Sequence, residues 1–281
     1  MPIYDQGYRR YAAREPLRQI RYWPITREAL RLILSKRAFL GLLAVSFGPF
    51  LVRLVLMYAS TRFPDLQRWL PVDGRIFGEF LNQQIFFTIL LSVFGASGLV
   101  ANDLRTGAIL VYLSRPLTRR DYVLGKLGVP LVLNLSVTLV PALVLYVAAL
   151  SLEPRKFFAW ELAWVVPAII GHALVISVVV SLLALAVSAA SRSARVAGLG
   201  FFGLIFGLEM VRLVLQHGFG RREAMLLSLY ADLRSLGVSV FDLTSRELEM
   251  YWVAPAAVLG VVALGCLAVL RARVRAVEIV T

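Results

Sequence analysis

The sequence predicts an all-α integral membrane protein. We expect six transmembrane helices, an N-terminal interfacial helix, a helical cytoplasmic segment between spans two and three, and a short helical outer segment between spans five and six. Hydrophobic residues make up 59% of the 281 residues and charged residues only 17%, and the mean hydropathy is +0.76. A soluble core cannot enclose so much apolar surface in a chain of this length. Lipid is therefore the expected surroundings of most of the chain.

Four spans are predicted from long runs without charged residues. A helix needs about 20 apolar residues to cross a bilayer, and such runs occupy 80–102, 127–152, 162–191 and 250–270. Two further runs are interrupted, one by Arg53 and one by Glu209 and Arg212, and we interpret them as spans whose outer ends carry charge. The predicted spans are about 38–60, 80–101, 127–151, 162–190, 196–216 and 253–270, within a transmembrane domain over 38–271.

The distribution of basic residues predicts the orientation, because Lys and Arg are retained on the cytoplasmic side. With the N-terminus inside, the inner segments carry 19 basic residues and the outer segments nine. Both termini, including the tail 272–281, are therefore expected to be cytoplasmic. The net charge of +13 then lies mainly on the inner face, where anionic lipid attracts it. We expect membrane lipid as a partner and no nucleic acid.

Residues 1–37 are expected to form a cytoplasmic tail and an interfacial helix. Thr26 fits an N-cap, and the following REALRLILSKR has a partly amphipathic helical pattern. Tyr22 and Trp23 precede it, and aromatic residues of this kind are enriched at membrane interfaces. The alternative is an ordinary cytoplasmic extension of the first span.

The segment 102–126, between spans two and three, is charged and has local signals of rigid structure. Asn102 or Asp103 can cap a short helix that runs to about Leu113. Pro116 then breaks it. Thr118 and Asp121 match a capping box, which predicts a new helix that continues through Lys126 into the third span. From these signals alone, a plain loop that follows the positive-inside rule remains the alternative.

The same segment, NDLRTGAILVYLSRPLTRRDYVLGK, resembles the cytoplasmic segment of type-2 ATP-binding-cassette (ABC) exporter permeases. In that family an acidic residue precedes a Gly-Thr-Leu run, and a small-x-Pro-x-Ser/Thr-Arg corner and a Gly-Lys pair follow. Here Asp103 takes the place of the usual glutamate, Ala108 of the threonine and Ile109 of the leucine. The motif covers about 25 residues, and the six spans extend the resemblance over nearly the whole chain.

This resemblance implies that 102–126 is a coupling helix that docks on a separate ATPase subunit. The residues that it assigns to coupling are Asp103, Arg105, Gly107, Ile109, Leu113, Arg115, Pro116, Arg119 and Lys126. It also implies a second permease copy or a similar permease, and location in a bacterial plasma membrane. The sequence has no G-x-x-x-x-G-K-[ST], so ATP and magnesium are expected on the ATPase, with no cofactor on this chain.

Charged residues at membrane depth are candidates for function. Arg53 and Arg212 either extend to the outer headgroups or form an outer gate or substrate contact, with Glu209 and Arg212 as its latch. His172 is expected to make a hydrogen-bonded helix contact rather than to relay protons.

The outer segment His217–Trp252 is expected to contain one or two short helices over about 224–236. They would lie on or dip into the outer interface, which resembles the re-entrant outer helices of the exporter family. A plain amphipathic cover is the alternative. Tyr251 and Trp252 fit the aromatic belt that begins the last span.

Other functions find less support. Gly198, Gly200 and Gly203 match G-x-G-x-x-G, but no strand precedes them, and we interpret Gly203 and Gly207 as a helix-packing motif, within the chain or across a dimer. Two histidines and one cysteine, with no H-E-x-x-H and no paired acids in the spans, supply no catalytic or metal site. An ATP-independent secondary transporter or channel, or an ABC-type scaffold for signalling or assembly, remains the alternative to an exporter of unidentified substrate.

Overall fold

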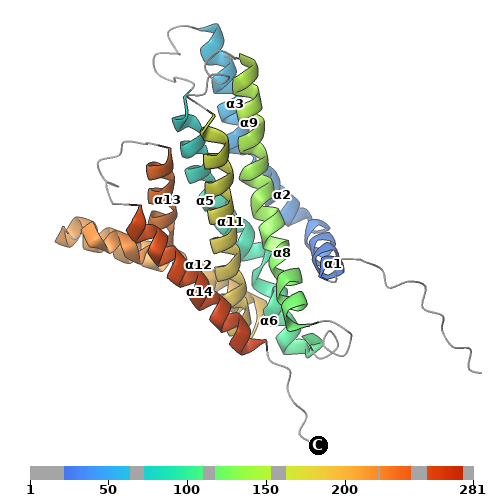
Figure 1. Ribbon diagram of the computed structural model, residues 1–281. Coiled ribbons are helices and arrows are strands. Elements are labelled where there is room, and N and C mark those ends of the chain that lie inside the picture. Colours follow the sequence, from blue (N-terminus) through green and yellow to red (C-terminus); the bar gives the residue numbers. More distant parts are fainter. Residues whose placement is uncertain are drawn as a thin grey trace, which may run out of the picture.

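The computed structural model describes residues 22–63, 73–109, 118–152, 163–220, 222–241 and 252–274. Every regular element within these ranges is a helix (Figure 1). Six segments are long and apolar enough to cross a membrane, namely Arg37–Ser60, Arg75–Thr106, Arg119–Leu152, Val165–Ala190, Ala194–Phe219 and Val253–Arg273. The predicted all-α fold with six membrane-spanning helices is confirmed, and the direction of the chain across the bilayer stays a prediction.

Each of the first three spans is made of two helices. The pairs are α2 (Arg37–Ser46) with α3 (Gly48–Arg62), α5 (Arg75–Gly95) with α6 (Ser97–Thr106), and α8 (Arg119–Val137) with α9 (Leu139–Leu152). Proline accounts for two of the breaks. Pro49 and Pro141 lie in the first turns of α3 and α9, and neither has the N–H that would continue the hydrogen bonding of the preceding helix.

The third break, at Ala96 between α5 and α6, is stabilised by a neighbouring helix. Ser188 lies near the end of α11 (Val165–Ala190). Its hydroxyl donates to the carbonyl of Ser97 at 2.7 Å and accepts from the backbone N–H groups of Val100 and Ala101 at 3.2 and 3.1 Å. Backbone groups freed by a break at membrane depth need such partners, because lipid offers none.

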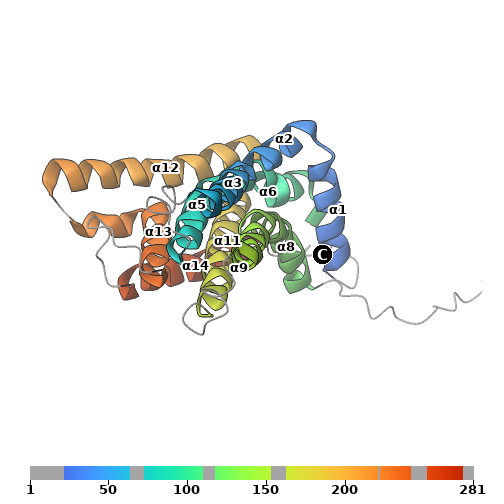
Figure 2. The same ribbon diagram turned by 90° about the horizontal axis from the view of Figure 1, so that it is seen from above.

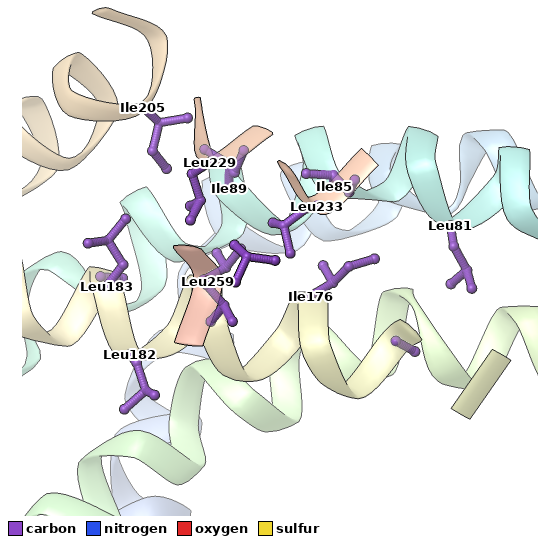
Figure 3. Close-up of a cluster of buried hydrophobic side chains, with 14 of the residues drawn as sticks. Leu81, Ile85, Ile89, Ile176, Leu182, Leu183, Ile205, Leu229, Leu233 and Leu259 are labelled. Carbon is purple, nitrogen blue, oxygen red and sulfur yellow. The ribbon is translucent and has the colours of Figure 1, made fainter. Parts of the chain in front are cut away.

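The core of the molecule forms around α11, which packs against α5, α6, α8 and α14 (Val253–Arg273). Side chains from several helices meet there, as Figure 3 shows: Leu81, Ile85, Ile89, Ile176, Leu182, Leu183, Ile205, Leu229, Leu233 and Leu259. Helix α11 is covered on most sides, so the other spans are positioned by their packing against it.

A buried polar network also joins the central helices. Asn134 of α8 donates to the hydroxyls of Ser92 on α5 and Ser181 on α11, at 3.1 and 3.2 Å. One turn further along the chain, the hydroxyl of Thr138 lies 3.4 Å from that of Ser177. Interhelical hydrogen bonds of this kind contribute on the order of 0.6 kcal/mol each. The network therefore fixes the register of α8 more than it adds stability.

The N-terminal helix α1 (Trp23–Leu34) packs along α8. The predicted cap at Thr26 is wrong, because the helix begins at Trp23 and Thr26 is buried within it. The Thr26 hydroxyl instead donates to the carbonyl of Gly125 at 2.7 Å. A Cβ on Gly125 would lie 2.9 Å from the Cβ of Ile25, so the glycine is what allows α1 to approach so closely. The interfacial position of α1 stays a prediction.

The fifth span is the least embedded of the later helices. In both views α12 (Ala194–Phe219) runs out beyond the rest of the bundle (Figures 1 and 2). It exposes Leu199, Phe202, Met210 and Val214. The outer segment that follows contains the 3₁₀ helix η2 (Arg222–Leu227) and α13 (Leu229–Val240). Two short helices are therefore present where one or two were expected; their depth relative to the membrane stays a prediction, and Tyr251 lies outside the described residues.

Candidate functional site

The candidate site lies where the second span ends and the third begins. The expected helix end at Leu113 lies outside the described residues. The expected N-cap at Asn102 or Asp103 is wrong, because both lie inside α6, which continues from the second span and ends at Thr106. Gly107 follows in the left-handed conformation, with φ of 70°. Glycine adopts that conformation without the steric penalty that a side chain brings. Residues 108 and 109 are helical again.

Three of the residues assigned to coupling, Leu113, Arg115 and Pro116, lie outside the described residues. The structure resumes at Thr118, which begins α8 with the predicted capping box. The backbone N–H of Asp121 donates to the Thr118 hydroxyl at 3.2 Å, and the Asp121 carboxylate accepts from the Thr118 N–H at 3.0 Å. The predicted capping box is confirmed. It could be predicted from the sequence because it depends only on residues three positions apart.

An ion pair closes the segment on itself. The carboxylate of Asp103, in α6, accepts from Lys126 Nζ at 2.7 Å and from the hydroxyl of Tyr122 at 2.8 Å. Lys126 and Tyr122 are buried in α8, with 6% and 1% of their surfaces exposed. A charge-assisted bond of this length between shielded groups is stronger than one at the surface. The ends of 103–126 are therefore held together through side chains.

Apolar contacts complete this clasp, by which we mean Asp103, Ile109, Tyr122 and Lys126. Ile109 is buried and packs with Tyr122 and with Val274, near the end of the last span. Arg105 and Arg119, by contrast, are exposed. The structure thus divides the assigned residues into two groups. Asp103, Ile109 and Lys126 hold the segment against the bundle, while Arg105 and Arg119 offer charge to solvent or to a partner.

Tyr122 was missing from the predicted site residues, although it lies in the motif. It precedes Lys126 by one helical turn, so the two share a face of α8. That spacing was the available signal. The spacing does not predict that both side chains contact the same carboxylate on α6.

Arg53 of α3 reaches across to the second span. Its guanidinium donates to the carbonyl of Ile76 at 3.3 Å and contacts Glu79 at 3.4 Å. Only 16% of the Arg53 side chain is exposed, against 60% for Glu79. Arg53 therefore binds the start of α5, and its role at the outer headgroups or in a gate stays a prediction.

Glu209 and Arg212 form the ion pair that the sequence predicted. Arg212 donates through Nη2 and Nε to the two carboxylate oxygens at 2.6 and 3.0 Å. The same carboxylate accepts from the hydroxyl of Ser228, the N-cap of α13, and Arg212 also donates to Gln216. The Glu209 carboxylate, through its bond with Ser228, thus ties α12 to the outer helix. Ser228 was not predicted, since nothing in the sequence pairs it with a residue 19 positions earlier.

His172 does not make the expected hydrogen bond through Nε2, which is buried without a partner among the described residues. Its ring packs edge-on against Phe241, with centroids 6.2 Å apart. Asn82 Oδ1 is likewise buried and without a partner there. Both atoms face Gly237 of α13, where an added Cβ would collide with Asn82 Oδ1 and lie 2.7 Å from His172 Nε2. The outer helix therefore covers two polar atoms of the spans.

Asp232, on the same outer helix, is also buried, with 1% of its surface exposed. Burial raises the pKa of its carboxyl to about 7, because a low-dielectric surrounding disfavours the charged form. Its Oδ2 has no hydrogen-bond partner in the described part of the chain. In that same part, no group of three or more His, Cys, Asp or Glu side chains is arranged to hold a metal ion.

Comparison with known protein families gives one match. A family model described as "ABC-2 family transporter protein" covers residues 79–229, which is more than half of the chain and includes the clasp, the Glu209–Arg212 pair and the start of α13. The comparison with curated proteins gives no match.

Proposed function

The chain belongs to the ABC-2 transporter family, and from that premise we propose that it is the permease subunit of an ATP-driven exporter in a bacterial plasma membrane. Membership implies a multi-pass membrane subunit that works with an ABC ATPase subunit and is not catalytic alone. The direction of transport, the dimer, the bacterial membrane and the cytoplasmic termini are parts of the proposal. ATP and magnesium would bind to the ATPase, and the substrate is unidentified.

The observation that carries the proposal is the clasp. A movement imposed on residues 103–109 reaches α8 through the Asp103–Lys126 pair and through the contact of Ile109 with Tyr122. A loop without such contacts would absorb the displacement by changing its backbone angles. The clasp passes it to the third span, and α8 passes it to α11 through Asn134. A stiff input of this kind suits a subunit that is driven by a separate motor.

The exposed face of α12 supports a second permease subunit as a partner. A Cβ added to Gly203 or Gly207 would have no atom within 4 Å among the described residues, so these glycines do not pack against a helix of this chain there. Glycines four residues apart allow two helix backbones to approach closely in lipid. Of the two possibilities that the sequence left open, packing across a dimer is therefore the one we propose.

The outer contacts support a gate. The Ser228 hydroxyl joins α13 to Glu209 of α12, whose carboxylate is held by Arg212 of the same helix, and Arg53 joins α3 to α5. Opening an outward route requires spans to separate, and these bonds are the ones that would break. Because the Ser228–Glu209 and Arg53–Ile76 bonds form between elements rather than within one helix, we propose them as a latch of the closed state, with Arg212 holding the Glu209 carboxylate in place.

Site-directed cross-linking tests the proposed coupling contact. Cys266 is the chain's single cysteine and is buried, so cysteines introduced at exposed positions can be labelled selectively. Arg105→Cys and Arg119→Cys should cross-link to the ATPase that co-purifies with the chain. Arg192→Cys, in the other predicted inner connection, is the matched control. The docking site would be contradicted if all three cysteine variants cross-linked to the ATPase equally. It would also be contradicted if no variant cross-linked while the ATPase was present.

The alternatives predict other results. A secondary transporter would move substrate in liposomes without ATP and without a second protein. An assembly scaffold would support ATP hydrolysis with no flux of any solute from the native membrane. Flux that requires both the ATPase and ATP would favour the exporter.

A further inference from the structure

A groove of about 530 Å³ opens between the start of α8 and the end of α14. Arg119 and Arg120 line it from α8 and Arg271 from α14, together with the apolar side chains of Leu124, Leu267 and Leu270. None of the coupling or gate contacts described above fills it. It is distinct from the clasp, although Arg119 belongs to both the coupling residues and the groove.

The order of residues along the two helices gives the groove a polar end and an apolar end. Helix α8 runs from Arg119 and Arg120 into the third span, and Leu124 lies about one turn further in. Helix α14 forms the sixth span, and Leu267 lies one turn before Arg271. Both helices therefore place arginines at the mouth of the bundle and leucines toward the membrane-spanning part.

The predicted orientation puts the arginine end in the inner leaflet's headgroup region. Residues 119 and 120 belong to the basic segment between spans two and three, and Arg271 begins the basic tail. Arginine binds phosphate groups through paired N–H donors. Basic pockets between transmembrane helices on the cytoplasmic side suit anionic lipid headgroups.

We propose that this groove is a binding site for an anionic phospholipid of the inner leaflet, with its phosphate held by Arg119, Arg120 and Arg271 and the upper part of an acyl chain against Leu124, Leu267 and Leu270. A soluble anion would leave the leucine wall exposed. A neutral lipid would leave three guanidinium groups without an opposite charge. An amphiphile with a negative headgroup satisfies both ends.

The site has a consequence for coupling. The lipid would join the helix that leaves the coupling segment to the last span, beside the contact of Val274 with Ile109 and Tyr122. Lipid composition would then affect how firmly the third and sixth spans move together. This consequence rests on the proposed function, whereas the lipid site itself rests on only one part of it, the cytoplasmic position of both termini.

The test measures lipid retention by the full-length chain in detergent, by native mass spectrometry during titration with phosphatidylglycerol. We expect one saturable phosphatidylglycerol site and no comparable retention of phosphatidylcholine. Arg120→Gln or Arg271→Gln should weaken binding about fivefold each, since a basic residue near an anionic surface contributes roughly that factor. Leu267→Asn should weaken it through the apolar wall, while leaving retention of inorganic phosphate unchanged.

Arg273→Gln is the matched control, because Arg273 lies in the same last turn of α14, is exposed, and does not line the groove. Equal losses from Arg273→Gln and Arg271→Gln would overturn the site as diffuse attraction. Displacement of the lipid by inorganic phosphate at equal concentration would show that the groove binds free anions. Protection of the groove by the ATPase, with no lipid retained in the complex, would assign it to protein docking instead.

Discussion

Asp103 and Lys126, which lie in different helices at the two ends of the charged segment, are joined by a 2.7 Å ion pair that Tyr122 shares. The pair turns a connection between two spans into a closed unit. Lys126 is buried, so Asp103 supplies an opposite charge to a shielded ammonium group. Stability and the proposed transmission of force therefore depend on the same carboxylate.

Removing that carboxylate should destabilise the protein. Asp103→Asn removes the carboxylate that lies 2.7 Å from the buried ammonium of Lys126, and breaking a buried pair in this way costs about 3 kcal/mol. We expect a lower thermal midpoint in detergent, with Asp103→Asn/Lys126→Met recovering part of the loss. Arg105→Gln, on the exposed face of the same helix end, is the control. A double variant as unstable as the single one would show that the ion pair is not the source.

The capping box should contribute a smaller, local amount. Thr118→Ala removes the hydroxyl that accepts from the Asp121 N–H, which should cost about 1 kcal/mol. Faster amide hydrogen exchange in the first turn of α8 is the readout. Thr106→Ala is the matched control, because that exposed hydroxyl only donates to the carbonyl of Asn102. Similar exchange in both variants would refute the cap's role.

Close packing of the outer helix on the second span depends on Gly78. A Cβ there would lie 2.7 Å from the Cβ of Phe241, just after α13, and the backbone would have to move. Gly78→Ala should cost about 1 to 3 kcal/mol, the usual range for overpacking. Gly171→Ala, where no atom lies within 4 Å of the added carbon, should be neutral or slightly stabilising. The thermal midpoints of the two variants compare them directly, and equal midpoints would contradict the packing role of Gly78.

The buried carboxyl of Asp232 predicts a pH dependence of the docking of α13. Burial raises its pKa from 3.8 to about 7, so the docked helix retains a proton that the undocked one releases. Docking should therefore weaken as pH rises from about 4 to 7, and become independent of this group above that range.

Asp232→Asn removes the titration and keeps the shape of the side chain. The wild-type thermal midpoint should fall relative to that of Asp232→Asn between about pH 4 and pH 7. A constant difference across this range would mean that Asp232 does not titrate there.

The proposed latch predicts an effect on transport. Arg212→Leu removes the donor that holds the Glu209 carboxylate in place and should alter ATP-dependent flux severalfold, because the bond of Ser228 on α13 depends on that carboxylate. Arg53→Leu tests the second contact, at the start of α5. Val214→Leu, at an exposed apolar position of α12, serves as the control. Unchanged flux in both arginine variants would remove the gate from the account.

Local patterns in the sequence were sufficient for some of these features. Thr118 with Asp121 and Glu209 with Arg212 are three residues apart, and helical geometry alone brings such pairs together. The six spans follow from apolar length. The same local reasoning misplaced Thr26. In the sequence, a threonine that caps a helix cannot be told from one that lies inside the helix and bonds to a neighbouring helix, as Thr26 does.

The features that were missed depend on contacts between helices. Neither the Asn134 network nor the bond from Ser228 to Glu209 has a fixed spacing in sequence. The end of α6 at Gly107 was also missed, because the helix continues from the second span rather than starting at Asn102. These contacts depend on how the helices are arranged around α11. The lengths of the apolar runs in the sequence do not determine that arrangement.

The most direct test of the account is the ATP turnover of the ATPase that co-purifies with this chain, measured in lipid with wild-type chain, Arg119→Glu and Arg192→Glu. If 102–126 receives the motor, Arg119→Glu should reduce permease-dependent turnover severalfold while Arg192→Glu leaves it near the wild-type value. Turnover that is the same for all three chains, together with substrate flux that persists without ATP, would contradict the account.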